Sequence, residues 1–246
     1  MTLRIARFAC PTLSALCAAS LVTLAACGGG SVCISFDGCV GTSPNSNLAL
    51  AGTAATGKAL ASANVNVTCA QGAGATLSDG GGRYSLAFNG VLPCMIAVTS
   101  GGTTLHSLAF AGGTFNTTPE TELMIVYLAA QLGTSESNLI VSFSSNAQFQ
   151  QALSNQSNVL AAQSAVAANL QQHYAVTLAV PAFLTTPFTV GQAGVDSDLD
   201  ALAKAGAIDA NGMPDPAAVS LMTQAGLAQP LAKTSASSAS AAVDAM

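Results

Sequence analysis

Charged side chains are scarce in this sequence. They make up 7% of the 246 residues, whereas an average soluble domain carries roughly 25%. Hydrophobic residues make up 50%, which excludes disorder driven by charge, because such disorder requires low hydrophobicity and high net charge. Among the charged residues, basic ones are fewer than acidic ones: six Lys and Arg compared with eleven Asp and Glu, for a net charge of −5. Without a basic patch to contact phosphates, we expect no nucleic-acid partner.

Recognisable catalytic motifs are also lacking. The sequence has no G-x-S-x-G segment, and His106 and His173 are its only histidines, so a Ser-His-Asp triad would have to be assembled by folding. Glu120 and Glu122 come closest to the paired carboxylates of a glycosidase. They stand at the start of a predicted helix, where the helix dipole already favours acidic residues. We expect no catalytic residue and no cofactor.

The first 26 residues have the features of an export signal. Arg4 and Arg7 precede an apolar run that is densest over residues 13–24, and a short basic segment before a short apolar stretch is typical of such signals. The alternative is a transmembrane helix. Pro11 and several hydroxyl residues interrupt the run, however, and it is too short to span about 30 Å well. No later segment reaches the roughly 18 uninterrupted apolar residues that a membrane span requires.

The end of this signal, Leu24-Ala25-Ala26-Cys27, resembles the lipobox of bacterial lipoproteins, and three glycines follow it. The resemblance implies cleavage before Cys27 and attachment of acyl chains such as palmitate at this residue. Each buried methylene contributes about 0.8 kcal/mol, so several chains anchor a protein firmly. We therefore expect a cell-envelope protein held to a membrane by its N-terminal lipid. By the same resemblance, Gly28 after the cysteine favours the outer membrane.

The remaining cysteines point to disulfides. Once the signal is removed and Cys27 is lipidated, four are left: Cys33, Cys39, Cys69 and Cys94. In an exported protein they indicate two disulfides, for which three connectivities are possible. We expect Cys33 and Cys39 to close a small loop within a flexible, lipidated tether over residues 27–47. A zinc site is the alternative for this pair, although zinc usually needs two ligand pairs.

From residue 48 to residue 115 the hydrophobic pattern has a period of two, which indicates strands. Val65, Val67 and Cys69 share one face of a predicted strand, and Cys94 is in phase with the inward residues of another. We therefore predict a buried disulfide between Cys69 and Cys94. Turn formers such as Asn89-Gly90 separate the runs, and short strands with Gly-rich turns predict a β-sandwich.

Three segments of this region resemble the carboxypeptidase regulatory-like domain, a transthyretin-like sandwich of seven strands found in many exported proteins. They are Gly52-Thr53, residues 56–67 (TGKALASANVNV) and residues 79–86 (DGGGRYSL). The sequence departs from the family pattern at Ala59, where proline is common, and by one extra glycine in the third segment. The resemblance implies an Ig- or transthyretin-like fold without catalytic residues, which acts as a spacer, a stabiliser or a binding surface.

Two patterns come close to ligand-binding motifs. Residues 52–59 match G-x-x-x-x-G-K, but Ala59 lacks the hydroxyl with which a P-loop holds Mg²⁺, and a strand pattern follows. Asp196, Asp198 and Asp200 indicate calcium, but alanines occupy the EF-hand positions for Gly and Glu. We interpret the first pattern as a turn and the second as acids in the first turn of a helix, and we expect no metal site.

From residue 116 onward the pattern becomes helical. Thr118-Pro119-Glu120 is typical of a helix start, and the helix is predicted to run to about residue 132, with Leu123, Val126, Tyr127 and Ala130 on one face. Further helices are predicted over residues 147–153, 158–174, 196–204 and 215–226, with an extended connection over residues 176–190. The helix predicted over residues 158–174 carries a core stripe formed by Val159, Ala162, Val166, Leu170 and Tyr174.

The predicted fold is therefore α+β, with an N-terminal β-sandwich followed by a small Ala-rich helical domain. Its predicted parts are a signal peptide (1–26), a lipidated tether (27–47), a β-sandwich (48–115), a helical domain (116–228) and a disordered tail (229–246). We expect a non-catalytic binding or structural role in the envelope, with an envelope protein or a glycan as partner. The alternatives are an envelope glycan or peptide hydrolase, or its accessory subunit, and a self-associating surface layer.

Overall fold

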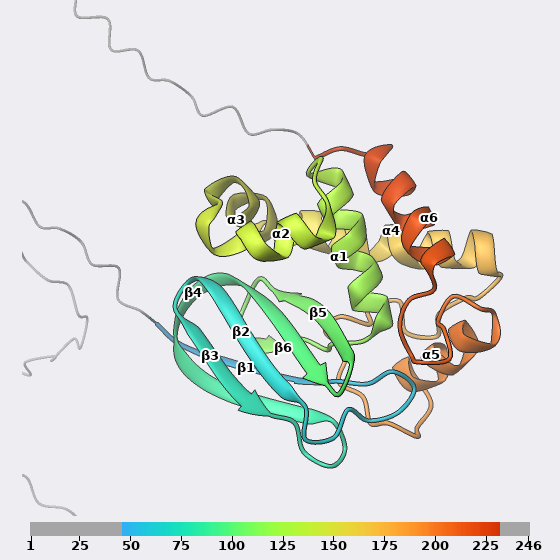
Figure 1. The fold of residues 1–246 in the computed structure, drawn as a ribbon, viewed down its shortest axis with the longest axis horizontal. Helices are drawn as coiled ribbons and strands as arrows, with labels where there is room; N and C mark the ends of the chain where they lie inside the picture. The colour runs from blue at the N-terminus through green and yellow to red at the C-terminus, as the bar shows by residue number, and fades with distance from the viewer. Residues whose placement is uncertain (1–45, 232–246) are drawn as a thin grey trace, which may run out of the picture. The chain divides into compact units, whose positions relative to one another are not determined.

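A computed structural model describes residues 46–231, and in this part of the chain every strand precedes every α-helix (Figure 1). The strands are β1 (Ser46–Thr53), β2 (Asn64–Gln71), β3 (Ala73–Leu77), β4 (Arg83–Ser100), β5 (Thr103–Ala109) and β6 (Gly113–Thr114). The helices are α1 (Pro119–Gln131), α2 (Glu136–Ser142), α3 (Ala147–Ser154), α4 (Gln156–Tyr174), α5 (Val195–Lys204) and α6 (Pro216–Leu227), with a turn of 3-10 helix, η1 (Phe143–Ser145), between α2 and α3. The protein is thus a mixed α and β structure with its strands first, as the sequence predicts.

One long strand, β4, organises the sheet. Its first half, residues 83–90, pairs antiparallel with β1, and β1 pairs in parallel with the short strand β6. Its second half, residues 91–100, pairs antiparallel with β2 and with β5, and β2 pairs in turn with β3. The sheet is therefore mixed, with the order β3-β2-β4-β1-β6 and with β5 beside the second half of β4.

The turn expected at Asn89-Gly90 does not form. Asn89 lies opposite Asn47 of β1, and the strand continues directly to Val91, which lies opposite Gln71 of β2. Strand partners on both sides of this point keep the backbone extended. Tertiary pairing therefore outweighs the local turn preference of the Asn-Gly sequence.

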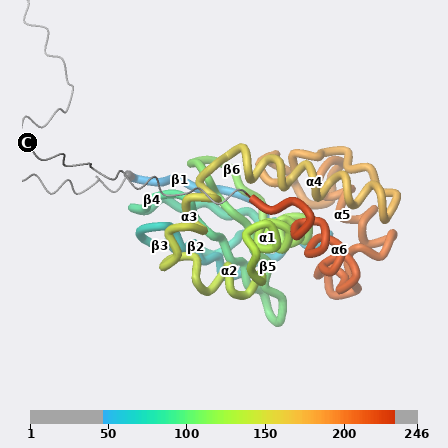
Figure 2. Tube along the Cα trace, turned by 90° about the horizontal axis from the view of Figure 1, so that it is seen from above, coloured from blue at the N-terminus to red at the C-terminus, as the bar shows by residue number. Residues whose placement is uncertain are grey.

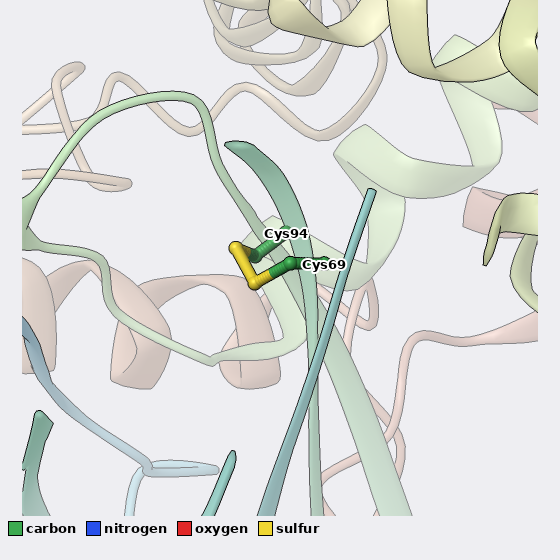
Figure 3. Close-up of a disulfide and its surroundings, with 2 residues drawn as sticks. All are labelled: Cys69 and Cys94. Carbon is green, nitrogen blue, oxygen red and sulfur yellow. A yellow bond between two sulfur atoms is a disulfide. The ribbon is translucent and has the colours of Figure 1, made fainter. Parts of the chain in front are cut away.

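The inward residues of β2 and β4 form a continuous buried row. Val65, Val67 and Cys69 are buried and alternate with exposed residues, because successive side chains of a strand point to opposite faces. Val67 lies opposite Ile96 in β4, and Cys69 lies opposite Cys94. A disulfide joins the sulfur atoms of Cys69 and Cys94, so the pair expected from the strand phase links two neighbouring strands (Figure 3).

Helix α1 is buried around its whole circumference. The sequence predicts one buried face, with Leu123, Val126, Tyr127 and Ala130, but all 13 residues of the helix are buried. The reason is its central place, since β5, α2, α4 and α6 all contact it (Figures 1 and 2). A helix enclosed in this way has apolar residues on all sides, and its two glutamates need to be neutralised or hydrogen-bonded.

The other helices agree with the sequence prediction except for α2. Helix α4 buries Val159, Val166 and Leu170 as expected, and α3, α5 and α6 begin and end within one or two residues of their predicted limits. Helix α2 is not predicted. It has an N-cap, Ser135, but Leu139 is the only one of its seven residues that is buried, so no apolar stripe marks it in the sequence.

The sheet and the helices share one hydrophobic core. Its buried residues come from both, for example Ile96 in β4, Leu123 in α1 and Met222 in α6. The described residues fall within a single compact unit of the chain. The division into a β domain and a helical domain at residues 115 and 116 stays a prediction.

The last described residues pack on α1. The side-chain amide of Gln131 donates a 2.8 Å hydrogen bond to the carbonyl of Gln229, and the backbone N–H of Leu231 donates a 3.0 Å bond to the carbonyl of Gln131. The sequence assigns residues 229–231 to a disordered tail. They are held instead because Gln131, at the end of α1, offers both a donor and an acceptor. Residues 232–246 lie outside the described residues.

Candidate functional site

A histidine and a glutamate meet where β5 contacts the first turn of α1. The Nδ1 atom of His106 lies 3.0 Å from Oε1 of Glu122 and 3.2 Å from Oε2, and the backbone N–H of His106 also donates to Oε2. The side chains are 14% and 9% exposed, respectively. The Glu122 carboxylate thus contacts both the ring and the backbone of His106, which fixes the ring beside it.

Two threonines hold the start of α1 against β5. Thr118 is the N-cap residue, and its side chain accepts a hydrogen bond from the backbone N–H of Thr121. In return, the Thr121 hydroxyl accepts a 2.9 Å bond from the backbone N–H of Thr118, which completes a capping box. The same hydroxyl donates a 2.8 Å bond to the carbonyl of His106. The residues that begin the helix therefore also place Glu122 beside His106.

Glu136, in the first turn of α2, adds a third group to this pair. One nitrogen or oxygen atom from each of His106, Glu122 and Glu136 lies within 4.8 Å of the other two. Burial, together with the hydrogen bond to Glu122 and its charge, raises the pKa of Glu136 to about 9. Burial opposes ionisation of Glu122 as well, but hydrogen bonds from His106 and Glu136 and the charge of His106 lower its pKa overall. At neutral pH, Glu136 therefore holds a proton that it shares with ionised Glu122.

Sequence reasoning missed this cluster. It pairs Glu122 only with Glu120, as acids at a helix start, and considers His106 only as a possible member of a Ser-His-Asp triad. Glu136 lies in a helix that the pattern does not predict. No spacing motif connects the three residues, because they come together only through the contacts that α1 makes with β5 and with α2. A polar pair buried on opposite elements leaves no periodic signal in a sequence.

A second acidic residue in α1 is more deeply buried. Glu120 is 0% exposed, and neither of its carboxyl oxygens has a hydrogen-bond partner. Burial and the nearby negative charge of Asp198 raise its pKa well above the ordinary value. Its surroundings in the core therefore favour the neutral form of the Glu120 carboxyl.

The acidic residues of α5 bind backbone groups of the preceding connection. The Asp198 carboxylate accepts hydrogen bonds of 2.8 and 2.9 Å from the N–H groups of Ala179 and Val180, and Asp196 accepts a 2.7 Å bond from Gly191. Asp200 is exposed. Within residues 46–231, these three acids do not form a cluster of the kind that holds a metal ion. The observed role of Asp196 and Asp198 is to attach the connection to the start of α5.

An open groove of about 550 Å³ lies between the strands β1 and β4 and the segment around Phe188. Nη2 of Arg83 donates a 2.7 Å hydrogen bond to the hydroxyl of Thr189 across it. The hydroxyl of Tyr84 is buried and donates to the carbonyl of Phe115. Asp79 and Ser85 also line the groove. It therefore offers hydrogen-bonding and apolar groups together, the usual character of a binding site.

The other predicted site residues either lie outside the described part of the chain or do not belong to the cluster of His106, Glu122 and Glu136. Leu24, Ala25, Ala26, Cys27, Cys33 and Cys39 lie outside the described residues, so lipidation and the second disulfide stay predictions. His173 is exposed in the last turn of α4, and within the described chain no hydroxyl hydrogen-bonds to the ring of either histidine. Lys58 is exposed in a bend that no helix follows, in agreement with the interpretation of this segment as a turn.

Comparisons of the chain with protein-family models, with curated proteins and with solved structures give no match. In the part of the chain that the structure describes, no helix combines the length and the apolar character needed to cross a membrane.

Proposed function

We propose that this protein is a cell-envelope lipoprotein with a non-catalytic binding or structural role. The observation that carries the proposal is the segment Leu24-Ala25-Ala26-Cys27, which follows a basic and then an apolar stretch and precedes three glycines. This order matches every part of a lipoprotein signal. Lipid on Cys27 would hold the folded part at a membrane, and Gly28 favours the outer membrane.

We further propose that residues 48–115 form a transthyretin-like sandwich of the carboxypeptidase regulatory-like kind. Two features support this assignment. The Asp79 side chain accepts hydrogen bonds from the N–H groups of Gly81 and Arg83, as expected for the Asp-to-Tyr hairpin motif. The two halves of β4 also pair with different strands. An experimental structure in which both halves belong to a single flat sheet would contradict the sandwich.

A binding role is supported by the groove beside Arg83 and Phe188. Its walls come from the sheet and from the connection before α5, and the connection is fixed by buried hydrogen bonds from Asn116. A preformed groove binds a partner without the cost of ordering its own residues. We propose an envelope protein or a glycan as the partner.

Lipid anchoring is tested with Cys27→Ser. Cells producing the wild-type chain or the variant are labelled with radioactive palmitate and separated into membrane and soluble fractions. We expect label and membrane retention in the wild type, and loss of both in Cys27→Ser. Cys39→Ser is the matched control, because it also removes a thiol near the N-terminus but leaves the lipobox intact. Unchanged retention of Cys27→Ser would overturn the proposal.

The groove is tested by photo-cross-linking in intact cells. A photoreactive residue replaces Ser85, which is exposed and lines the groove, or Lys204 as the control, which is exposed at the end of α5. We expect a defined envelope protein or glycan adduct from position 85 and none from position 204. Equal or absent adducts at both positions would count against a binding role at this groove.

The pairing of His106 with Glu122 favours the alternative, a hydrolase or its accessory subunit, because a carboxylate that orients an imidazole is a recurring part of catalytic sites. Purified protein is assayed against envelope glycans and peptides. Hydrolysis that His106→Gln abolishes and His173→Gln leaves unchanged would favour the enzyme over the binding protein.

A further inference from the structure

We propose that His106, Glu122 and Glu136 form a binding site for one divalent transition-metal ion, Mn²⁺ or Zn²⁺. The three residues come from three elements, β5, α1 and α2, so their side chains converge from separate parts of the chain. The site is independent of the lipid anchor and of the groove beside Arg83.

The spacing of the side chains fits one ion. Nδ1 of His106 is 3.0 Å from Oε1 of Glu122, and one potential ligand atom from each of the three residues lies within 4.8 Å of the others. Ligand atoms at 2.0–2.2 Å from a tetrahedral zinc ion lie about 3.3–3.6 Å apart. Small rotations of the side chains therefore suffice to place all three around a single ion.

The hydrogen bonds of the cluster leave one carboxylate oxygen of Glu122 and one of Glu136 available to bind a metal ion. The backbone N–H of His106 donates to Oε2 of Glu122, which orients that carboxylate and leaves Oε1 facing the ring. Oε1 of Glu136 is buried and has no hydrogen-bond partner. A buried carboxylate oxygen without a partner is unfavourable unless it is neutralised or coordinates a cation. In the metal-free protein a proton on Glu136 meets this requirement; a bound ion would release that proton to solvent and take the unpartnered Oε1 as a ligand.

Charge and donor type select the kind of metal. Two carboxylates balance the charge of a divalent ion, so the bound cluster is neutral with a neutral imidazole. One nitrogen and two carboxylate donors suit Mn²⁺ and Zn²⁺, whereas Ca²⁺ takes six to eight oxygen ligands. His106 is 14% exposed, which gives the ion a route from solvent and leaves room for water to complete its coordination.

The test is titration of the metal-free full chain with Mn²⁺ alone, followed by calorimetry and by the EPR signal of the free ion. Manganese is used first because thiolates prefer softer metals, so any free cysteine of the chain competes little for the ion. We expect one Mn²⁺ per chain. Glu136→Gln, which keeps the size and hydrogen bonding of the side chain, is expected to weaken binding about tenfold or more. His173→Gln is the matched control and should bind as the wild type does.

A spectroscopic measurement on the wild type keeps the test independent of how the variants fold. Pulsed EPR of the bound Mn²⁺ should show coupling to one imidazole nitrogen, and His106→Gln should remove that coupling. Absence of the coupling, or an affinity that Glu136→Gln does not change, would overturn the proposal. It would also be overturned if neither Mn²⁺ nor Zn²⁺ bound at millimolar concentration, or if only zinc bound and Cys33→Ser abolished that binding.

Discussion

The side-chain amide of Asn116 donates a 2.8 Å hydrogen bond to the carbonyl of Phe183, a residue 67 positions further along the chain. The same amide nitrogen donates a 2.7 Å hydrogen bond to the carbonyl of Thr186. The side-chain oxygen of Asn116 accepts a 3.2 Å bond from the backbone N–H of Thr53 in β1. Asn116 is 0% exposed. One buried amide therefore connects the sheet to the irregular segment that forms a wall of the groove.

Removing this amide should destabilise the protein strongly. Asn116→Ala leaves two carbonyl groups and one N–H without partners in the interior, and each unsatisfied buried group costs about 1–3 kcal/mol. We expect a loss of about 3 kcal/mol or more in the free energy of unfolding, measured by urea denaturation. Asn138→Ala, at an exposed position in α2, is the control and should change stability by less than about 0.5 kcal/mol.

The disulfide between Cys69 and Cys94 closes a loop with a sequence separation of 25. In the chain-entropy description, a crosslink of this length stabilises the folded state by about 3 kcal/mol, because it restricts the unfolded chain. We expect the double variant Cys69→Ala/Cys94→Ala to lose about that much free energy of unfolding, measured by urea denaturation. A reducing agent should produce a similar loss in the wild type and no further loss in the double variant.

Burial of Glu120 should make stability depend on pH. Its pKa in the folded state is well above the ordinary value of 4.5, because the carboxyl is buried and lies near the charge of Asp198. The folded state therefore holds this proton more tightly than the unfolded chain does. The resulting contribution to stability is fully present below about pH 4.5 and is lost as the pH rises through the folded pKa.

Glu120→Gln removes the ionisable group and should remove this part of the pH dependence. We expect the variant to gain stability relative to the wild type as the pH is raised from 4 to 8, measured by urea denaturation at each pH. Asp200→Asn, which changes an exposed carboxylate on α5, is the control and should follow the wild-type profile. A wild type that gains stability relative to Glu120→Gln with rising pH would contradict a raised pKa at Glu120.

Close packing between α1 and α6 depends on Gly226. A Cβ atom at this position would lie 2.4 Å from the carbonyl oxygen of Tyr127 and 2.7 Å from Cβ of Ala130. Because the first contact is with backbone, Gly226→Ala should force the helices apart, and we expect a loss of about 1–3 kcal/mol despite the higher helix propensity of alanine. Gly102→Ala, where nothing lies within 4 Å of the added atom, should be close to neutral. Urea denaturation of both variants distinguishes crowding from a general effect of replacing glycine.

The sequence predicts those features that are encoded locally. The alternation of Val65, Val67 and Cys69 predicts both the strand and the disulfide, and Thr118-Pro119 predicts the start of α1, because a strand has a period of two and a helix start needs an N-cap. The enclosure of α1 is not predicted. Its apolar residues occur all round the helix, and only the contacts of β5, α2, α4 and α6 reveal that every side is covered.

The candidate site depends on long-range contacts and is therefore harder to predict. His106 and Glu122 each have an adequate local explanation, one as a strand residue and the other as an acid near a helix N-terminus. Glu136 belongs to a short helix that buries a single residue, Leu139. The meeting of these side chains follows from how β5, α1 and α2 pack, and a periodic pattern contains no information about such packing.

Strand β4 has a further consequence for how the chain tolerates insertions. Residues 83–90 and 91–100 share one continuous backbone, so the alternation of side chains in one half fixes the alternation in the other. A single residue inserted after Gly90 would turn Cys94, Ile96 and Val98 to the opposite side while Tyr84 kept its place. The two groups of strands that pair with β4 therefore depend on one shared alternation of inward and outward side chains. A change in length near the middle of β4 is tolerated only in steps of two residues, or with a bulge that restores the alternation.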